Sequence, residues 1–290
     1  MTPHPQEPVQ TVIRRPTGAL SLFVDTLWFV QSDRLSLRGT NLPMLHGELM
    51  FNFSEFFSIQ PLGAQPANTG HGSWFSGLQT APSQSQTAGR HETLGVLLKP
   101  WGLFPLTNVP AHAFGQLFVS GEAVLGPVIA PLTDALQQAR SATGKLDILE
   151  RFLSDRYVDS DIPAYVHYAH SFLHRHPFRN GIVTELCRHL RISRKSLTGA
   201  FRKYLGLSPG QYVRLLRFRA ATDAMAARPD LSLTDLTYQQ GFFDQAHFIH
   251  LFRAFAGMTP GAYRSFIRAH QQASVGLPET SSPSFIHHTG

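Results

Sequence analysis

The sequence contains a single cysteine, Cys187, among its 290 residues. One cysteine cannot form a disulfide within the chain, and without a second thiolate it is a poor start for a metal site. The ordinary interpretation of such a residue is a small apolar side chain on the buried face of a helix. The cysteine count therefore excludes a scaffold held together by disulfides.

Long hydrophobic runs and the common catalytic motifs are also absent. No apolar segment approaches the roughly 20 residues that cross a bilayer, and the N-terminal MTPHPQEPVQ lacks the basic-then-apolar order of a secretory signal. A phosphate-binding P-loop, GxSxG and HExxH are missing as well. We therefore expect a cytoplasmic protein that has no membrane partner, no catalytic residues, no metal and no cofactor.

Acidic residues are scarce in the second half of the chain. Residues 160–270 hold 15 Lys and Arg against 6 Asp and Glu, whereas residues 1–159 hold 10 against 12. A basic half in an otherwise ordinary globular composition favours a polyanion partner, of which nucleic acid is the commonest. A basic surface that serves only solubility is the alternative that charge leaves open.

The spacing of apolar residues in the first half of the chain changes near residue 122. From about 12 to 110, Gly and Pro separate short apolar segments such as LSLFVDTLWFV and GELMFNFSEFFSIQP, which predict strands in a β-rich barrel or sandwich. The following segments, EAVLGPVIAPLTDALQQARSA and KLDILERFLSDRYV, have apolar residues at spacings of three and four and predict a helical hairpin. Residues 1–11 and 271–290 have the composition of disordered ends.

Two segments of the second half repeat each other. SRKSLTGAFRKYLGLSPGQYVR at 193–214 aligns with GFFDQAHFIHLFRAFAGMTPGAYR at 241–264, and the alignment places Phe201 on Phe252, Gly206 on Gly257 and Pro209 on Pro260. Two copies are too few for a solenoid, so they indicate paired units within one compact domain.

Each copy has the pattern of a short helix, a turn and a second helix, over about 182–205 and about 232–256, with a linker helix over 209–227 between them. Thr184, Ser193, Ser232 and Asp244 are the predicted N-caps of the four helices, and Gly206 and Gly257 end the second helix of each copy. A second helix with a polar outer face is typical of the helix-turn-helix, which places that helix in the DNA major groove.

The two units, the intervening YVRLLRFRAATDAM and the whole second copy resemble the DNA-binding domain of the AraC/XylS family of bacterial transcription regulators. The resemblance covers roughly 165–268 and implies two units that dock in successive major-groove turns. The spacing supports this independently, because a helix over 209–227 would be about 28 Å long, close to the roughly 34 Å between groove turns.

The resemblance also implies which residues touch DNA. The base-facing positions fall on Arg194, Lys195, Thr198 and Gly199 in the first recognition helix, and on Gln245, Ala246, His247, Ile249 and His250 in the second. The phosphate contacts fall on Thr184, Arg202, Lys203, Ser232 and Arg253. Glutamine can bond bidentately to adenine and lysine to guanine, while isoleucine or alanine can touch a thymine methyl.

Four positions depart from the family pattern. Gly199 and His250 stand where relatives often carry a long polar or basic side chain, and Phe243 replaces a turn residue that is commonly serine. Arg191 replaces a turn residue that is commonly glycine, which a non-glycine residue tolerates if its φ stays negative.

Much of residues 15–157 is similar to the cupin-like sensory β-barrel found ahead of such DNA-binding domains, on the segments LWFV, LPMLHGELMFNF, FSGLQT and LGVLLKPWG. Relatives usually have Pro-Asp-Gly where this chain has Leu45-His46-Gly47. A barrel of this size can enclose one small ligand. The candidate lining of an effector pocket is Trp28, His46, Phe51, Phe53, Trp74 and Trp101, and plain barrel core is the alternative for each.

A metal site receives less support from the sequence. His46, Glu48, His71 and His91 invite comparison with a cupin metal centre, but only His46-Gly47-Glu48 keeps a ligand-like spacing, and the other two lie in turn-rich segments. His247 and His250 share a helix face without a third ligand nearby. These residues nevertheless leave one alternative function open, a cupin-type metal-dependent enzyme fused to a DNA-binding domain.

The predicted protein has more than one domain and is of the α+β class. A β-rich, cupin-like barrel or sandwich with a helical hairpin occupies 12–157, and an all-α domain with two helix-turn-helix units occupies 160–270. We expect a sequence-specific transcription regulator rather than an enzyme, with promoter or operator double-stranded DNA as partner and a small-molecule effector in the N-terminal domain. RNA polymerase and a second copy of the chain are further candidate partners.

Overall fold

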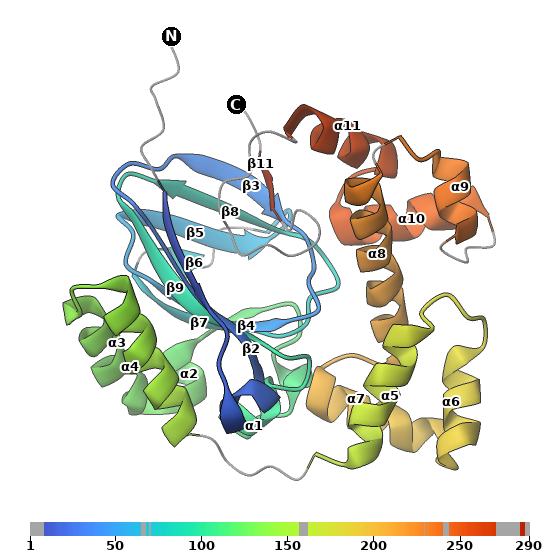
Figure 1. The fold of residues 1–290 in the computed structure, drawn as a ribbon, viewed down its shortest axis with the longest axis horizontal. Coiled ribbons are helices and arrows are strands. Elements are labelled where there is room, and N and C mark those ends of the chain that lie inside the picture. The colour runs from blue at the N-terminus through green and yellow to red at the C-terminus, as the bar shows by residue number, and fades with distance from the viewer. Residues whose placement is uncertain are drawn as a thin grey trace.

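The computed structural model describes residues 9–64, 68–69, 71–156, 162–228, 230–239, 244–270 and 285–287. They form a β-rich N-terminal domain and a helical C-terminal domain that lie against each other (Figure 1). This confirms the predicted fold class. Within the described residues, no helix has the length and apolarity needed to cross a membrane.

The N-terminal domain contains two antiparallel sheets. The first has the order β1 (Gln10–Arg14), β2 (Val24–Ser32), β9 (His91–Leu98), β4 (Gly47–Asn52), β7 (Gly72–Ser76) and β10 (Phe118–Ser120). The second has the order β11 (Phe285–His287), β3 (Leu37–Asn41), β8 (Ser83–Ala88), β5 (Phe56–Pro61) and β6 (Asn68–Thr69). The sheets are not joined into one closed ring, so the domain is a sandwich rather than a closed barrel.

Both faces of the first sheet are apolar. On β4, Leu49 and Phe51 belong to a core that also contains buried leucines of the following helices, whereas Met50 packs with Phe57 and Ile59 of the second sheet. Successive side chains of a strand point to opposite faces, so a run of apolar residues such as LMF is needed to serve both. The central strands are therefore nearly continuous in hydrophobic residues.

Short helices follow the strands and cover the outer face of the first sheet. They are α1 (Leu103–Thr107), α2 (Gly121–Leu125), α3 (Ile129–Gln138) and α4 (Ala142–Asp155), with 3-10 turns η1 (Gly18–Leu22), η2 (Ala111–Ala113) and η3 (Gly126–Val128). Helices α3 and α4 pack on each other as the predicted hairpin. Inside α4, Lys145 is buried and pairs with Glu92 of β9 at 3.0 Å, which ties the hairpin to the sheet.

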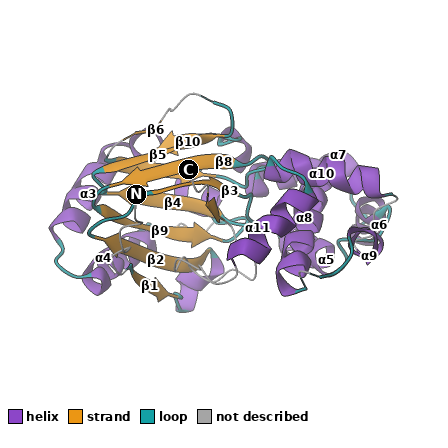
Figure 2. Cartoon of the chain, turned by 90° about the horizontal axis from the view of Figure 1, so that it is seen from above, coloured by secondary structure: helices purple, strands orange, loops and turns teal. Residues whose placement is uncertain are grey.

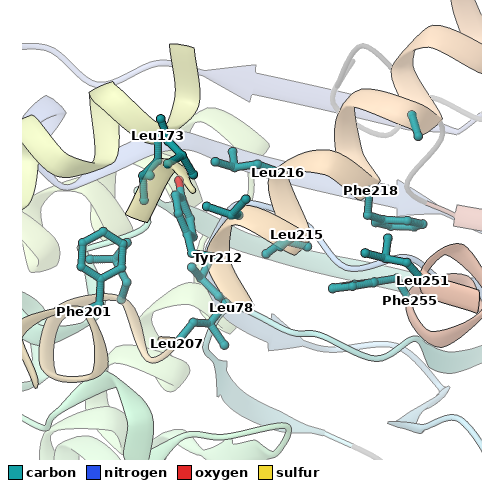
Figure 3. Packing of buried hydrophobic residues seen from close by; sticks show 14 of the residues in the cluster. Leu78, Leu173, Phe201, Leu207, Tyr212, Leu215, Leu216, Phe218, Leu251 and Phe255 are labelled. Carbon is teal, nitrogen blue, oxygen red and sulfur yellow. The ribbon is translucent and has the colours of Figure 1, made fainter. Parts of the chain in front are cut away.

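The C-terminal domain consists of helices around one hydrophobic core. They are α5 (Ala164–Arg175), α6 (Ile182–Leu190), α7 (Arg194–Leu205), α8 (Pro209–Ala227), α9 (Leu233–Gln239), α10 (Gln245–Ala256) and α11 (Pro260–His270). Figure 3 shows how α8 contributes Tyr212, Leu215 and Phe218 to this core. Leu42 and Leu78 of the N-terminal domain belong to the same cluster, so the two domains share apolar contact.

Most of the predicted helix starts are confirmed. Ser193 Oγ accepts from the Ser196 N–H, Ser232 Oγ from the Asp235 N–H, and Asp244 Oδ1 from the His247 N–H. Thr184 is a correction, because α6 already begins at Ile182 behind Gly181, whose φ is 68°. A glycine in the left-handed region changes the chain direction there, which leaves Thr184 inside the first helical turn, where it caps nothing.

The two turns also show how the helices end. Gly206 and Gly257 have φ of 82° and 72° and end α7 and α10 as predicted. Arg191, which ends α6, has φ of 55° and ψ of 36°. The negative φ that would let a non-glycine residue sit here without strain is therefore not adopted, and the backbone keeps the left-handed geometry that favours glycine. Phe243 lies outside the described residues.

The C-terminal tail holds a second correction. Residues 271–290 were expected to be disordered throughout, but Phe285–His287 form β11, which pairs antiparallel with β3 through Phe285–Asn41, Ile286–Thr40 and His287–Gly39. β3 would otherwise be an edge strand with unpaired backbone groups, and such an edge accepts an extended segment readily. The tail thus returns to the N-terminal domain (Figure 1).

Candidate nucleic-acid interface

Helix α8 fixes the two recognition helices relative to each other. At 1.5 Å per residue its 19 residues span about 28 Å. Near its start, Tyr212 packs on Phe201 of α7 with ring centroids 5.9 Å apart; further along, Phe218 stacks on Phe255 of α10 at 5.1 Å and meets Phe252 at 5.2 Å. Both recognition helices are therefore held by contacts between buried aromatic rings.

The start of α8 is closed by a reciprocal cap. Ser208 Oγ accepts from the Gln211 N–H, while Gln211 Oε1 accepts from the Ser208 N–H. This reciprocal capping box, with Pro209 in the first turn, satisfies backbone donors that a helix start leaves unpaired. Figure 1 shows α7 and α10 near opposite ends of α8, and Figure 2 shows both along the same side of the C-terminal domain.

The first recognition helix exposes the residues that the resemblance assigned to the bases. Arg194, Lys195 and Gly199 are exposed and Thr198 is half-buried, whereas Leu197 and Phe201 are fully buried. A helix repeats every 3.6 residues, so a buried stripe at 197, 200, 201 and 204 leaves the opposite stripe to solvent. A Cβ at Gly199 would meet no atom within 4 Å, so this position lies over open space.

The second recognition helix, α10, likewise has one exposed and one buried stripe. Gln245, Ala246, His247 and His250 are exposed and Ile249 is half-buried. Phe248 and Phe252 are fully buried and hold the helix against the core. The N-cap Asp244 is 2.7 Å from the His247 N–H. All nine predicted base-facing residues therefore lie on the outward sides of α7 and α10.

The five predicted phosphate contacts are exposed too: Thr184, Arg202, Lys203, Ser232 and Arg253. Two of these five side chains also make contacts within the protein. Ser232 Oγ donates to the Asp235 carboxylate at 2.6 Å. Lys203 Nζ lies 4.7 Å from the ring centroid of Phe104 in the N-terminal domain. Nothing in the sequence had linked Lys203 to that domain.

A metal centre receives no support from the described part of the chain. There, no group of three or more His, Cys, Asp and Glu residues could hold a metal ion. His91 is instead a buried core residue that bonds Ser54 and Thr87 through Nδ1 and Thr93 through Nε2, and burial lowers its pKa to about 4. His46 is mostly buried, and desolvation lowers its pKa as well.

The six residues suggested for an effector pocket do not share one environment. Trp28 and Trp74 pack between the two sheets, and Phe51 and Phe53 pack in the core under the helices. Trp101 instead makes edge contacts with His167 and His170 of α5, with ring centroids 4.6 and 4.8 Å apart, at the boundary of the two domains. His46 is mostly buried, bonds the Leu98 backbone, and has Asp25, Lys99 and Arg219 as its charged neighbours. The structure does not bring the six together as one lining.

Residues 186–265 match a family of helix-turn-helix domains. They form an AraC-type helix-turn-helix domain. This confirms the resemblance drawn from the doubled segment, and it favours a DNA-binding regulator over the enzyme alternative. Residues 13–120 match a domain family of unknown function, DUF6597.

One curated relative is the Msm operon regulatory protein of Streptococcus mutans. It is 26% identical over 110 residues, which are 38% of this chain and 39% of that protein. The match thus spans well under two thirds of that relative's length.

One similar solved structure is that of ToxT from Vibrio cholerae. It is 12% identical, the match covers 89% of this chain and 98% of that one, and the TM-score is 0.46. The C-terminal domain of AraT, a response regulator from Geobacillus stearothermophilus, is 18% identical over 41% of this chain and 97% of that one, with a TM-score of 0.35.

Proposed function

We propose that the protein is a sequence-specific DNA-binding regulator of transcription. Its two helix-turn-helix units dock in successive major-groove turns on one face of a duplex, and a small molecule bound by the rest of the chain controls docking. The observation that carries the proposal is that α8 holds two recognition helices on one side of the domain, each with its polar stripe exposed. The basic balance of residues 160–270 adds long-range attraction to phosphates.

The roles of single residues follow from their places on the helices. The exposed stripes of α7 and α10 read bases, and we assign this role to Arg194, Lys195, Thr198, Gly199, Gln245, Ala246, His247, Ile249 and His250. Thr184, Arg202, Lys203, Ser232 and Arg253 contact phosphates. Phosphate contacts position a protein and base contacts specify the sequence, so the two sets differ in how their loss affects binding.

Gln245 and Arg253 of α10 allow a direct test, since both are exposed on one helix. We expect Gln245→Ala to cost about 1 to 3 kcal/mol on the cognate duplex and to relax preference at one base pair, with the salt dependence unchanged. We expect Arg253→Ala to weaken all sequences alike and to reduce the slope of log K against log salt by about 1.

The measurement is a mobility-shift or anisotropy titration of the full chain on duplexes selected from genomic fragments, between about 50 and 200 mM salt. Gln137→Ala and Arg151→Ala, which change exposed residues of the N-terminal helices α3 and α4, are the matched controls and should bind as the parent does. The proposal fails if the parent binds no fragment selectively, or if its affinity is insensitive to salt.

A further inference from the structure

The N-terminal domain touches both recognition helices at the same place, the glycine that ends each of them. A Cβ built on Gly206 would lie 3.0 Å from the Ala111 carbonyl oxygen. A Cβ built on Gly257 would lie 2.6 Å from Leu62 Cδ2 and 3.3 Å from Pro82 Cγ. Neither point leaves room for a side chain, so the N-terminal domain packs directly on the ends of α7 and α10.

These glycines lie at the ends of the two stripes that the proposed function turns toward the bases. On α7, Lys195, Gly199 and Arg202 are exposed at spacings of four and three, and a further step of four leads to Gly206. Such spacings keep residues on one face of a helix. The same steps along α10 lead from Ala246 to Gly257. The N-terminal domain therefore stands beside the exposed face of each recognition helix, at its C-terminal end.

A continuous edge of the N-terminal domain joins the two contact points. Gln116 Oε1 accepts hydrogen bonds from the Thr80 N–H at 2.8 Å and from the Ala81 N–H at 3.1 Å, which links the segment after η2 to the turn before β8. The Leu62 N–H donates to the Pro82 carbonyl oxygen at 3.0 Å. We call residues 62, 79–82 and 111–116 the flanking edge.

The flanking edge lies in two long segments that contain no charged residue. Residues 56–89 and residues 100–121 hold no Asp, Glu, Lys or Arg, although 15% of the whole chain is charged. A carboxylate at this edge would repel the phosphates of a duplex held by α7 and α10. The edge instead offers N–H donors, from the exposed His112 ring and from the Gln116 amide, whose orientation is fixed by the two hydrogen bonds that its oxygen accepts.

Lys203 shows how near the N-terminal domain stands to the expected phosphates. Its Nζ lies 4.7 Å from the centroid of the Phe104 ring, and its side chain is exposed. A lysine ammonium moves on a flexible four-carbon stem, so it can turn from that ring to a phosphate while the domains keep their arrangement. A phosphate bound by Lys203 would then lie within reach of the flanking edge.

We propose that the flanking edge is part of the DNA interface and lies along the phosphates beside both recognition helices, with His112 and Gln116 as donors near α7. The inference rests on the proposed function and deepens it, because it adds a second domain to the surface that holds the duplex. Phosphate contacts position a protein without reading sequence, so base preference stays with α7 and α10.

Opposite charge changes at His112 test the part of the edge beside α7. On the cognate duplex, at about 150 mM salt where the screening length is about 8 Å, we expect His112→Lys to tighten binding by about two- to fivefold and His112→Glu to weaken it by a similar factor. His112→Lys should also increase the slope of log K against log salt by about 1. Base preference should not change in either variant.

The matched controls are Gln137→Lys and Gln137→Glu. Gln137 is exposed on α3, which lies on the side of the N-terminal domain away from the helical domain (Figure 1). These variants make the same changes of net charge far from the flanking edge, so both should bind as the parent does. The melting temperature of each variant should equal that of the parent.

A second position tests the part of the edge beside α10. Ala81 is exposed next to Pro82, which meets Gly257. We expect Ala81→Lys to tighten binding by about two- to fivefold, whereas Ala130→Lys on α3, its matched control, should change nothing.

The outcomes separate this inference from the proposed function. If the parent binds a duplex selectively but the lysines at 112 and 81 act no differently from their controls, the duplex does not lie beside the edge and this inference alone fails. If those lysines weaken binding in a folded protein, the edge obstructs DNA and the inference is again refuted. If the parent binds no duplex selectively, both proposals fail.

Discussion

Arg191 offers a sharp test of the turn in the first helix-turn-helix unit. Its φ of 55° and ψ of 36° place a non-glycine residue in the left-handed region. The Ile192 N–H donates to the Cys187 carbonyl at 3.1 Å and the Arg191 N–H to the Arg188 carbonyl at 3.3 Å, which is the hydrogen-bond pattern of a helix end that glycine normally closes.

The magnitude follows from two opposing terms. A side chain with a Cβ in the left-handed region costs about 1 to 2 kcal/mol, and glycine gives back about 0.4 to 1 kcal/mol because it gains more freedom in the unfolded chain. We therefore expect Arg191→Gly to raise the free energy of unfolding by about 0.5 to 1 kcal/mol. Both backbone hydrogen bonds remain available to glycine.

The assay is urea unfolding of the full chain, followed by far-ultraviolet circular dichroism, with Arg191→Ala as the matched control. Alanine keeps the Cβ, so it should show no gain. An equal gain in both variants would mean that the long side chain, rather than the backbone, carries the strain. A loss of stability in Arg191→Gly would refute the reasoning altogether.

Two further perturbations probe the buried charges and histidines. Lys145→Met should destabilise the N-terminal domain by about 3 kcal/mol, because the nearly buried Glu92 loses its buried partner at 3.0 Å and keeps only the exposed Arg90 at 3.4 Å. Adding Glu92→Gln should restore part of the loss in urea unfolding, and a loss below about 1 kcal/mol would contradict the pairing. Burial lowers the pKa of both His91 and His170 to about 4, below the ordinary value of 6.5. The unfolded chain then binds more protons between these values, so stability is complete above pH 6.5 and falls as the pH drops toward 4, by up to about 1.4 kcal/mol per pH unit for each histidine. Unfolding midpoints at pH 7 and pH 5 measure this, and equal midpoints would rule it out.

Local signals of the sequence predicted much of the helical domain. Ser193, Ser232 and Asp244 each stand four positions before the first fully buried residue of a helix and accept a backbone N–H three positions on. Capping of this kind depends on neighbours within one turn, so it can be predicted without knowledge of the fold. The exposure of the two recognition stripes follows from the same periodicity, because the aromatic residues of the buried stripe identify the opposite face.

Features that depend on distant parts of the chain could not be predicted in this way. The pairing of β11 with β3 joins residues 285–287 to residues 39–41, and a three-residue strand carries no periodic signal of its own. The contacts of Trp101 with His167 and His170 were likewise missed, since the tryptophan was assigned to the interior of the N-terminal domain. Thr184 failed as a cap because Gly181 offered an earlier helix start that propensity alone does not favour.

The contact between Lys203 and Phe104 connects the fold to the proposed function. Lys203 lies near the C-terminal end of α7, where its ammonium group contacts the Phe104 ring of the neighbouring domain. Under the proposed function the same group binds a DNA phosphate, and it cannot make both contacts at once. Cation–π contact at an exposed site is worth about 0.5 to 1 kcal/mol, which is too little to hold the domains alone. The shared cluster that includes Leu42 and Leu78 adds apolar contact between the domains, so the domain contact and the position of Lys203 are linked. Under the proposed function, a change that releases Lys203 from Phe104 would therefore also change the affinity of α7 for DNA.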